Sequence, residues 1–120
     1  MYETMLKQHY TLPVYLLLLS FGLSAQIITI QPTDAGADDA LTLIFDATQG
    51  NAELAGASQI YMHHGVVTST PDGTDWNYVI GNWGADDGVG AMTPVNGQPG
   101  KWQITFTPTV RSYFGVPSSE

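Results

Sequence analysis

Residues 40–47 read Ala-Leu-Thr-Leu-Ile-Phe-Asp-Ala, and this stretch gives the clearest indication of the fold. Large apolar side chains stand at Leu41, Leu43 and Phe45, at every second position. Successive side chains of a β-strand point to opposite faces, so this period of two places the three side chains on one face. The stretch therefore predicts a strand with one face directed at a core.

The same alternation recurs along the chain, between turn signals spaced about ten residues apart. The predicted strands cover residues 27–31, 40–47, 59–67, 75–80, 91–95 and 101–108. In the last strand Trp102, Ile104 and Phe106 share a face, and we expect them in the core. The last two strands are expected to form a hairpin across Asn96-Gly-Gln-Pro-Gly100.

The connections between these strands complete the prediction of the fold class. Residues 81–90 are rich in Gly and Asp and are predicted to form a long loop. Helix is expected only as a turn near residues 110–113, because no other stretch after residue 25 keeps a helical period. Two antiparallel sheets packed through their apolar faces fit this pattern. The sequence therefore predicts an all-β, immunoglobulin- or fibronectin-like β-sandwich of the cysteine-free kind.

The first 25 residues differ in character from the rest of the chain. Residues 11–23 are largely apolar, with Lys7 before them and the small residues Ser24 and Ala25 after them. A helix of this length rises about 20 Å, short of the ~30 Å of hydrocarbon in a bilayer. We therefore predict a secretory signal peptide over residues 1–25, cleaved before Gln26, and a mature domain over 26–120. A membrane anchor or a buried helix is the alternative.

The composition excludes several classes of partner. The chain has 120 residues, three Lys or Arg against eleven Asp or Glu, a formal net charge of −8, and no cysteine. Binding to nucleic acid or to an anionic membrane needs clustered basic residues, so neither is expected. The absence of cysteine excludes disulfides, a thiolate nucleophile and Cys-ligated zinc. We expect a single secreted or cell-surface domain without membrane attachment once the signal peptide is removed.

His63 and His64 are the only histidines outside the predicted signal peptide. On a strand, adjacent side chains face opposite sides, so the two cannot hold one metal ion between them. The chain also lacks the spaced motifs of zinc proteases and serine hydrolases. We expect one buried histidine hydrogen-bonded to backbone beside an exposed neighbour, and we predict no catalytic residue and no metal site.

Acidic residues cluster in three predicted loops. They are Asp34, Asp38 and Asp39; Asp72 and Asp75; and Asp86 and Asp87. Calcium takes six to eight oxygen ligands, which clustered carboxylates can supply, but the spacing does not match an EF-hand loop. We expect solvated turns and no cofactor, with a calcium ion as the alternative.

Exposed aromatic rings are the remaining candidates for a binding site. Trp83 lies in the predicted 81–90 loop and is expected to be exposed, with Asn82 and Asp86 beside it as partners for sugar hydroxyls. Trp76 is placed either in the core or in the same platform, and the core is favoured because sandwiches often bury one central tryptophan. The site predicted for a ligand is therefore Trp83, Asn82, Asp86 and Trp76.

A series of short motifs in a fixed order adds a family resemblance over residues 27–118. They are Thr42-Leu-Ile-Phe-Asp-Ala47, Gly50-Asn51, Leu54-Ala-Gly56, Tyr61-Met-His63, Gly65-Val66, Trp76, Trp83-Gly84, Met92-Thr93, Trp102, Ile104 and Arg111-Ser-Tyr-Phe-Gly-Val116. The set resembles the N-terminal β-sandwich accessory domain of secreted multi-domain proteins, many of which carry an α-amylase-family catalytic domain. In such domains a further strand follows, so the resemblance implies that this chain is the leading part of a longer protein.

The resemblance implies a non-catalytic accessory module of a secreted glycan-degrading enzyme. Its partners would be the downstream domains of the same polypeptide and α-glucan or starch, with the module either binding glycan or supporting the catalytic domain. The alternative is a structural or adhesion module of a large surface protein without sugar binding. The sequence beyond Glu120 would distinguish them, since a catalytic barrel supports the first and repeated sandwiches support the second.

Overall fold

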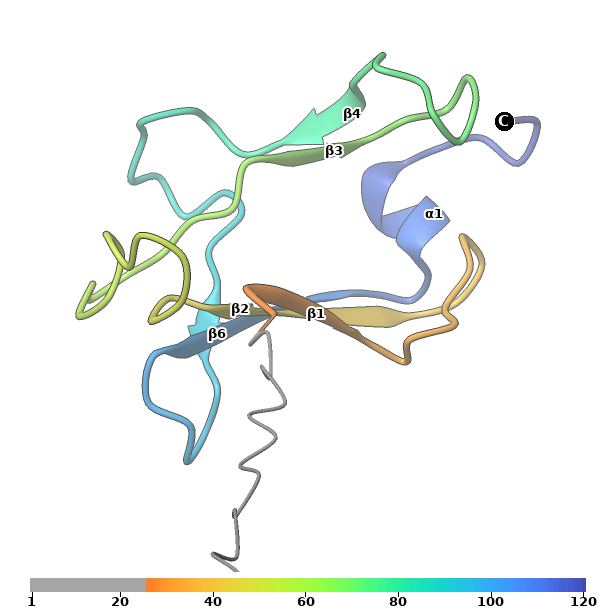
Figure 1. The fold of residues 1–120 in the computed structure, drawn as a ribbon. Helices are drawn as coiled ribbons and strands as arrows, with labels where there is room; N and C mark the ends of the chain where they lie inside the picture. The colour runs from red at the N-terminus through yellow and green to blue at the C-terminus, as the bar shows by residue number, and fades with distance from the viewer. Residues whose placement is uncertain (1–25) are drawn as a thin grey trace, which may run out of the picture.

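The computed structural model describes residues 26–120 as a β-rich domain with one short helix (Figure 1). The elements are β1 (Ile28–Gln31), β2 (Leu41–Asp46), β3 (His64–Val66), β4 (Asn77–Ile80), β5 (Thr93–Pro94), β6 (Lys101–Phe106) and α1 (Val110–Phe114). The predicted all-β class is confirmed. The predicted signal peptide, residues 1–25, lies outside the described residues. Within the described range, no helix has the length and apolar character needed to cross a bilayer.

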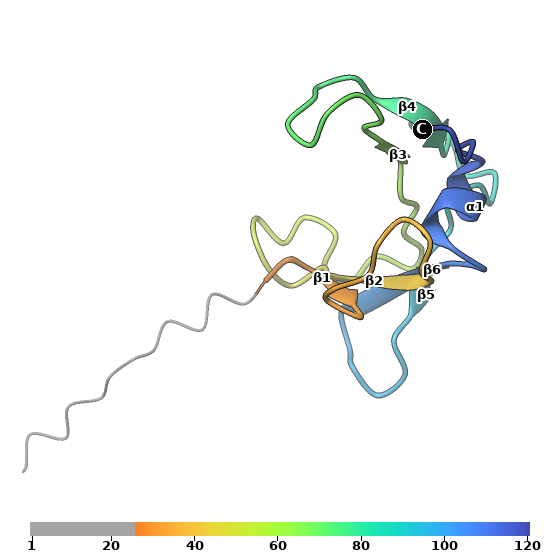
Figure 2. The same cartoon turned by 90° about the vertical axis from the view of Figure 1, so that its right-hand side faces the viewer.

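The strands form two antiparallel sheets. The larger has the order β1-β2-β6-β5, and the smaller pairs β3 with β4. In the larger sheet Leu43 stands opposite Ile30 on one side and Ile104 on the other, so apolar side chains form a row across three strands. The predicted hairpin of β5 and β6 is confirmed, with Thr93 opposite Gln103. Figure 2 shows the two sheets on opposite sides of the domain, with α1 beside them.

The core lies along β6 and the segments next to it. Ala47, Ile60, Met92 and Trp102 form a buried cluster, and Trp102 is only 8% exposed. The core position predicted for Trp102 is therefore correct. Its neighbour on the same face, Phe106, belongs to a second aromatic group with His64, Tyr113 and Phe114, whose ring centroids lie 4.5–5.7 Å apart.

The helix α1 confirms the predicted turn near residues 110–113. Thr109 caps its first turn, because the hydroxyl accepts a hydrogen bond from the Ser112 N–H at 3.0 Å. Gly115 ends it in the left-handed conformation, with φ of 72°. The Val110 N–H donates to the Asp39 carbonyl at 2.8 Å, which ties the helix to the loop after β1. Phe114 is thereby held in the core.

The strand predicted over residues 59–67 is wrong in its extent, because only His64–Val66 form a strand and Tyr61 makes an isolated bridge to Ala91. Residues 60–62 run beside residues 90–92, with the Met62 N–H donating to the Gly90 carbonyl at 2.8 Å and the Met92 N–H to the Ile60 carbonyl at 2.9 Å. Only after that does β3 begin, at His64, and pair with β4. A period of two continues through both parts, so the pattern cannot show where the bridge ends and β3 begins.

The strand predicted over 75–80 begins later, at Asn77, and contains a bulge. His64 pairs with Ile80 and Val66 with Asn77, so β4 has one residue more than β3 between these pairs. Tyr78 has a positive φ of 51°, which is uncommon outside glycine and fits the extra residue of a bulge. The bulge breaks the period of two within the predicted 75–80 strand.

The inner face of the larger sheet is open at its β1 edge. Ile28 and Ile30 stand opposite Phe45 and Leu43, whose side chains pack on the core. Yet Ile28 is 52% exposed and Ile30 36% exposed. An apolar hollow of about 210 Å³ lies there, lined among others by Ile28, Leu43 and Leu54. Within residues 26–120, part of the inner face of the larger sheet is therefore accessible to solvent.

Candidate functional site

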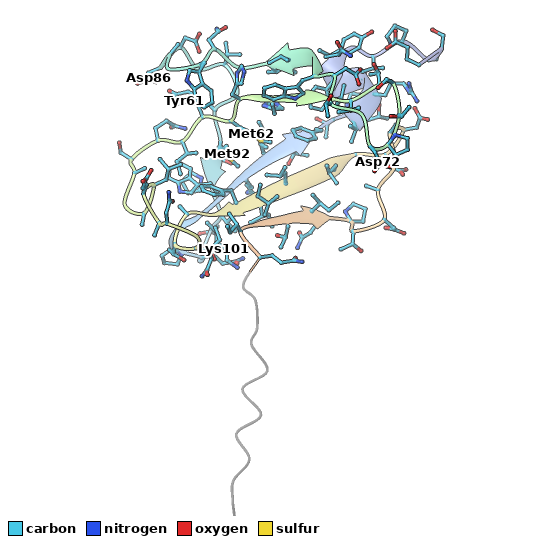
Figure 3. The ribbon with its side chains drawn as sticks, turned by 45° about the horizontal axis from the view of Figure 1, so that its top comes forward. Tyr61, Met62, Asp72, Asp86, Met92 and Lys101 are labelled. Carbon is cyan, nitrogen blue, oxygen red and sulfur yellow. The ribbon has the colours of Figure 1, made fainter. Side chains whose placement is uncertain are left out.

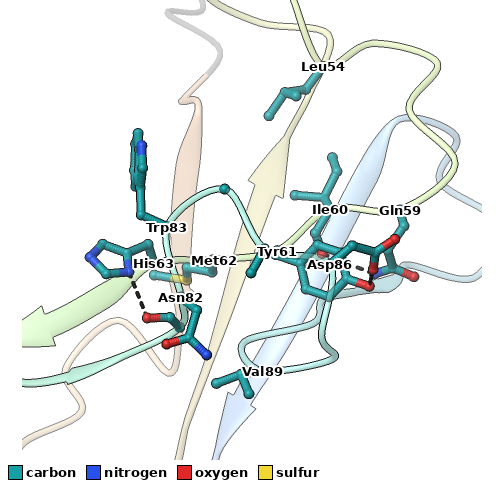
Figure 4. A pocket seen from close by; sticks show the side chains of 13 residues that line it. Leu54, Gln59, Ile60, Tyr61, Met62, His63, Asn82, Trp83, Asp86 and Val89 are labelled. Atoms are coloured by element: carbon teal, nitrogen blue, oxygen red, sulfur yellow. Dashed lines mark hydrogen bonds between the residues drawn. The ribbon is translucent and has the colours of Figure 1, made fainter.

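A hollow lies between the extended segment 59–63 and the loop 81–90. Its volume is about 530 Å³, and Figure 4 shows the side chains that line it. Three of the residues predicted as a ligand site, Asn82, Trp83 and Asp86, line it together. The structure thus brings these three residues together at one hollow.

Trp83 projects from the loop and is 86% exposed, as predicted. Its ring meets that of His63 edge to face, with centroids 5.5 Å apart and an angle of 78° between the planes. The loop turns next to it at Gly84, whose φ of 75° favours glycine. The indole therefore presents most of its surface to solvent while His63 supports one part of it.

Trp76 is not in the core, so the favoured prediction for this residue was wrong. It is 51% exposed. It precedes β4, and its indole covers the backbone of Gly65 on β3: a Cβ added to Gly65 would lie 2.4 Å from the Trp76 Nε1. Since His64 points into the core, its neighbour Gly65 faces outward. Because Gly65 has no side chain, the indole can pack against the backbone on the outer face of the small sheet.

His63 connects the two tryptophans. Its ring contacts Trp76 edge to face at 5.1 Å and Trp83 at 5.5 Å. Its Nδ1 lies 3.0 Å from the carbonyl oxygen of Gly81 (Figure 4). Because a carbonyl only accepts, we assign the proton to Nδ1, which fixes the ring against the start of the loop. Sequence reasoning missed this role, since the contacts join residues 13 to 20 positions apart.

Hydrogen bonds fix the polar rim of the hollow. The Tyr61 hydroxyl donates to the carboxylate of Asp86, and Figure 3 shows the two side by side. This bond raises the pKa of Tyr61, because removing its proton would leave two negative charges together. Asn82 donates through Nδ2 to Asp87 at 2.5 Å. That bond, with one from the Val89 N–H, lowers the pKa of Asp87 and keeps it ionised.

His64, the other histidine, is a core residue. It is 4% exposed, its Nδ1 donates to the Met62 carbonyl at 2.9 Å, and the Tyr113 hydroxyl donates to its Nε2 at 3.0 Å. Burial lowers its pKa below the ordinary value of 6.5, which keeps the ring neutral. The prediction of one buried histidine bonded to backbone is confirmed, while His63 is half-buried instead of exposed.

The acidic loops engage protein groups of their own. Arg111 pairs with Asp38 through its Nε at 2.8 Å, and Asp75 accepts hydrogen bonds from Ser69 and from Asn77. Over residues 26–120 there is no group of three or more His, Asp or Glu side chains placed to hold a metal ion.

A comparison with known protein families assigns the domain to one of them. Residues 28–120 match the family described as Domain of unknown function (DUF8578). The chain belongs to this family. The match begins at the first residue of β1 and covers every strand, the helix and the hollow, so the DUF8578 domain and the described fold coincide. The comparisons with curated proteins and with solved structures found no match.

Proposed function

We propose that this domain is a non-catalytic accessory module of a secreted glycan-degrading enzyme of the α-amylase type, and that it binds carbohydrate in the hollow beside Trp83. The observation that carries the proposal is the exposure of Trp83, 86%, on the rim of a hollow of about 530 Å³. A large aromatic side chain so exposed, next to fixed polar groups, is typical of a binding surface.

The chemistry of the hollow suits a sugar. One face of a pyranose ring carries mainly C–H groups, which can stack on an indole, while hydroxyls project from its edge. Asp86 can accept from such hydroxyls, and the amide of Asn82 can donate or accept. Tyr61 and Asp87 already hold these two side chains. Little side-chain freedom is therefore lost when the ligand binds, which favours affinity.

The resemblance to accessory β-sandwich domains supports a wider architecture for this chain. We propose that the two sheets belong to an immunoglobulin-like sandwich, and that a further strand after Glu120 completes it. The exposed inner side chains of β1, Ile28 and Ile30, support this, because another strand would cover them and the apolar hollow that Ile28 lines. Secretion through residues 1–25 and a catalytic domain downstream belong to the same proposal.

Retention on insoluble starch tests the proposed function. We expect the domain to be retained, and tryptophan fluorescence to change on titration with maltooligosaccharides. Trp83→Ala should lose both responses, and Val79→Ala should keep them, because Val79 is an exposed residue of β4 that does not line the hollow. No retention and no fluorescence change with folded wild-type protein would reject sugar binding. Incubation with maltoheptaose is expected to give no products.

A structural or adhesion module without sugar binding is the second candidate. The half-exposed Ile28 and Ile30 on β1 favour it, because an uncovered apolar sheet edge can pack against a neighbouring domain. Under this alternative Trp83→Ala leaves all measured properties unchanged, and repeated sandwiches follow Glu120 in the full reading frame.

A further inference from the structure

We infer that the sugar site has two stacking positions, Trp83 and Trp76, aligned by His63, so that its ligand is a chain of several sugar units and not a single sugar. This inference rests on the proposed function. It adds the length of the ligand, the role of a residue outside the hollow, and a positioning role for His63.

Trp76 has the properties of a stacking platform. The added-Cβ distances of 2.4 Å to Nε1 and 2.7 Å to Cδ1 show that the pyrrole edge of the indole lies directly over Gly65. The indole is nevertheless 51% exposed, so the surface turned away from β3 is open to water. An aromatic ring with one side on a strand and the other in solvent is ready to receive a flat apolar surface.

The two indoles are close enough to serve one ligand. Each contacts the same imidazole, at 5.1 Å and 5.5 Å between ring centroids. Their separation therefore cannot exceed these two distances combined, which is within reach of neighbouring units of one oligosaccharide. His63 directly precedes β3, and Gly65 of β3 lies beneath Trp76, so both tryptophans lie beside this one segment of the chain.

His63 acts as a positioning residue. Its Nδ1 bond to the Gly81 carbonyl fixes the ring to the first residue of the loop, and the loop runs close to the strand there. A Cβ on Gly81 would lie 2.7 Å from the Met62 carbonyl oxygen, which shows how tight this approach is. Movement of the imidazole would change the orientation of both indoles together, although His63 need not touch the sugar.

The polar groups are unevenly distributed between the two positions. Asn82 and Asp86 line the hollow with Trp83, whereas Trp76 lies outside that lining. The unit stacked on Trp83 should therefore be recognised by hydroxyl contacts as well as by stacking. The unit on Trp76 should be held by stacking alone, so Trp76 governs the gain in affinity with chain length.

Isothermal titration with glucose, maltose, maltotriose, maltopentaose and maltoheptaose tests the inference. For the wild type we expect the affinity to rise at least tenfold from the shortest ligand that binds measurably to the longest. Trp76→Ala should remove most of this rise while changing the affinity for that shortest ligand less than twofold. Trp83→Ala should abolish binding of every length, and Val79→Ala should match the wild type.

His63→Ala separates positioning from a merely structural role. We expect it to flatten the dependence on length as Trp76→Ala does, while the protein stays folded and still binds the shortest ligand through Trp83. If either Ala variant fails to fold, Trp76→Phe or His63→Gln replaces it. The rise in affinity with ligand length is then expected to be smaller than in the wild type.

The outcomes distinguish the inference from the proposed function. Binding that is equally tight for all lengths, or a rise with length that Trp76→Ala leaves intact, overturns the inference while sugar binding stands. No binding of any ligand by the folded wild type overturns the proposed function and, with it, the inference.

Discussion

Replacing Gly65 by alanine tests the packing that places Trp76 on the surface. The added methyl group would lie 2.4 Å from Nε1 and 2.7 Å from Cδ1 of Trp76, and 2.9 Å from the backbone oxygen of Asn77. All three distances are shorter than normal contacts. The indole is half-exposed and can swing away, whereas the oxygen belongs to β4 and moves only with the strand.

The expected loss in the free energy of unfolding follows from these contacts. Overpacking of this kind costs about 1–3 kcal/mol, and alanine in place of glycine in a strand recovers about 0.5–1 kcal/mol of backbone entropy. We therefore expect Gly65→Ala to lower the free energy of unfolding by ~1–2 kcal/mol. In a Trp76→Ala background the contacts with the indole are gone, so the loss should shrink by about 1 kcal/mol, within the range of couplings between touching residues.

Urea unfolding followed by far-ultraviolet circular dichroism measures the four proteins of this double-mutant cycle. Gly36→Ala is the matched control, because its Cβ would meet only the Asp39 side chain at an ordinary 3.5 Å. It should change the stability by less than about 0.5 kcal/mol. An equal cost of Gly65→Ala with and without the Trp76 ring would refute the packing described here.

Three further predictions concern the core and the helix. Stability should fall as the pH is lowered from 7.5 to 5.5, because burial lowers the pKa of His64 and the unfolded chain, near pKa 6.5, takes up the proton first; urea unfolding of His64→Gln should lack this fall. Trp102→Ala, at a buried position, should cost about 3–5 kcal/mol, seen as a large decrease in the urea midpoint. Thr109→Ala removes the cap of α1 and should cost about 1 kcal/mol in thermal unfolding, whereas Thr107→Ala, at an exposed position without this bond, should have little effect.

The strands of the larger sheet could be predicted because their signal is local. In β2 and β6 apolar side chains recur at every second position and turn residues stand at both ends. The exposure of Trp83 was predictable for a similar reason, since the Gly and Asp around it cannot form a regular buried element. These predictions depend on neighbours in sequence.

The rest of the site depends on contacts between distant segments. Trp76 is on the surface because Gly65, eleven residues earlier, leaves space for its indole on the outer face of β3. The late start of β3 within residues 59–67 goes with the bridge of residues 60–62 to residues 90–92, and the bulge at Tyr78 with the pairing to β3. A pattern of alternating side chains contains none of this information, so the role of His63 could be found only in three dimensions.

The indole N–H signals in a ¹H–¹⁵N spectrum, followed during titration with maltoheptaose, give the most direct test of sugar binding at this surface. Of the three tryptophans, two are exposed around His63 and one, Trp102, is buried in the core. We expect the Trp83 and Trp76 signals to shift together with a single saturation curve while the Trp102 signal stays in place. Signals that all remain still at high ligand concentration, or a shift confined to Trp102, would contradict the account.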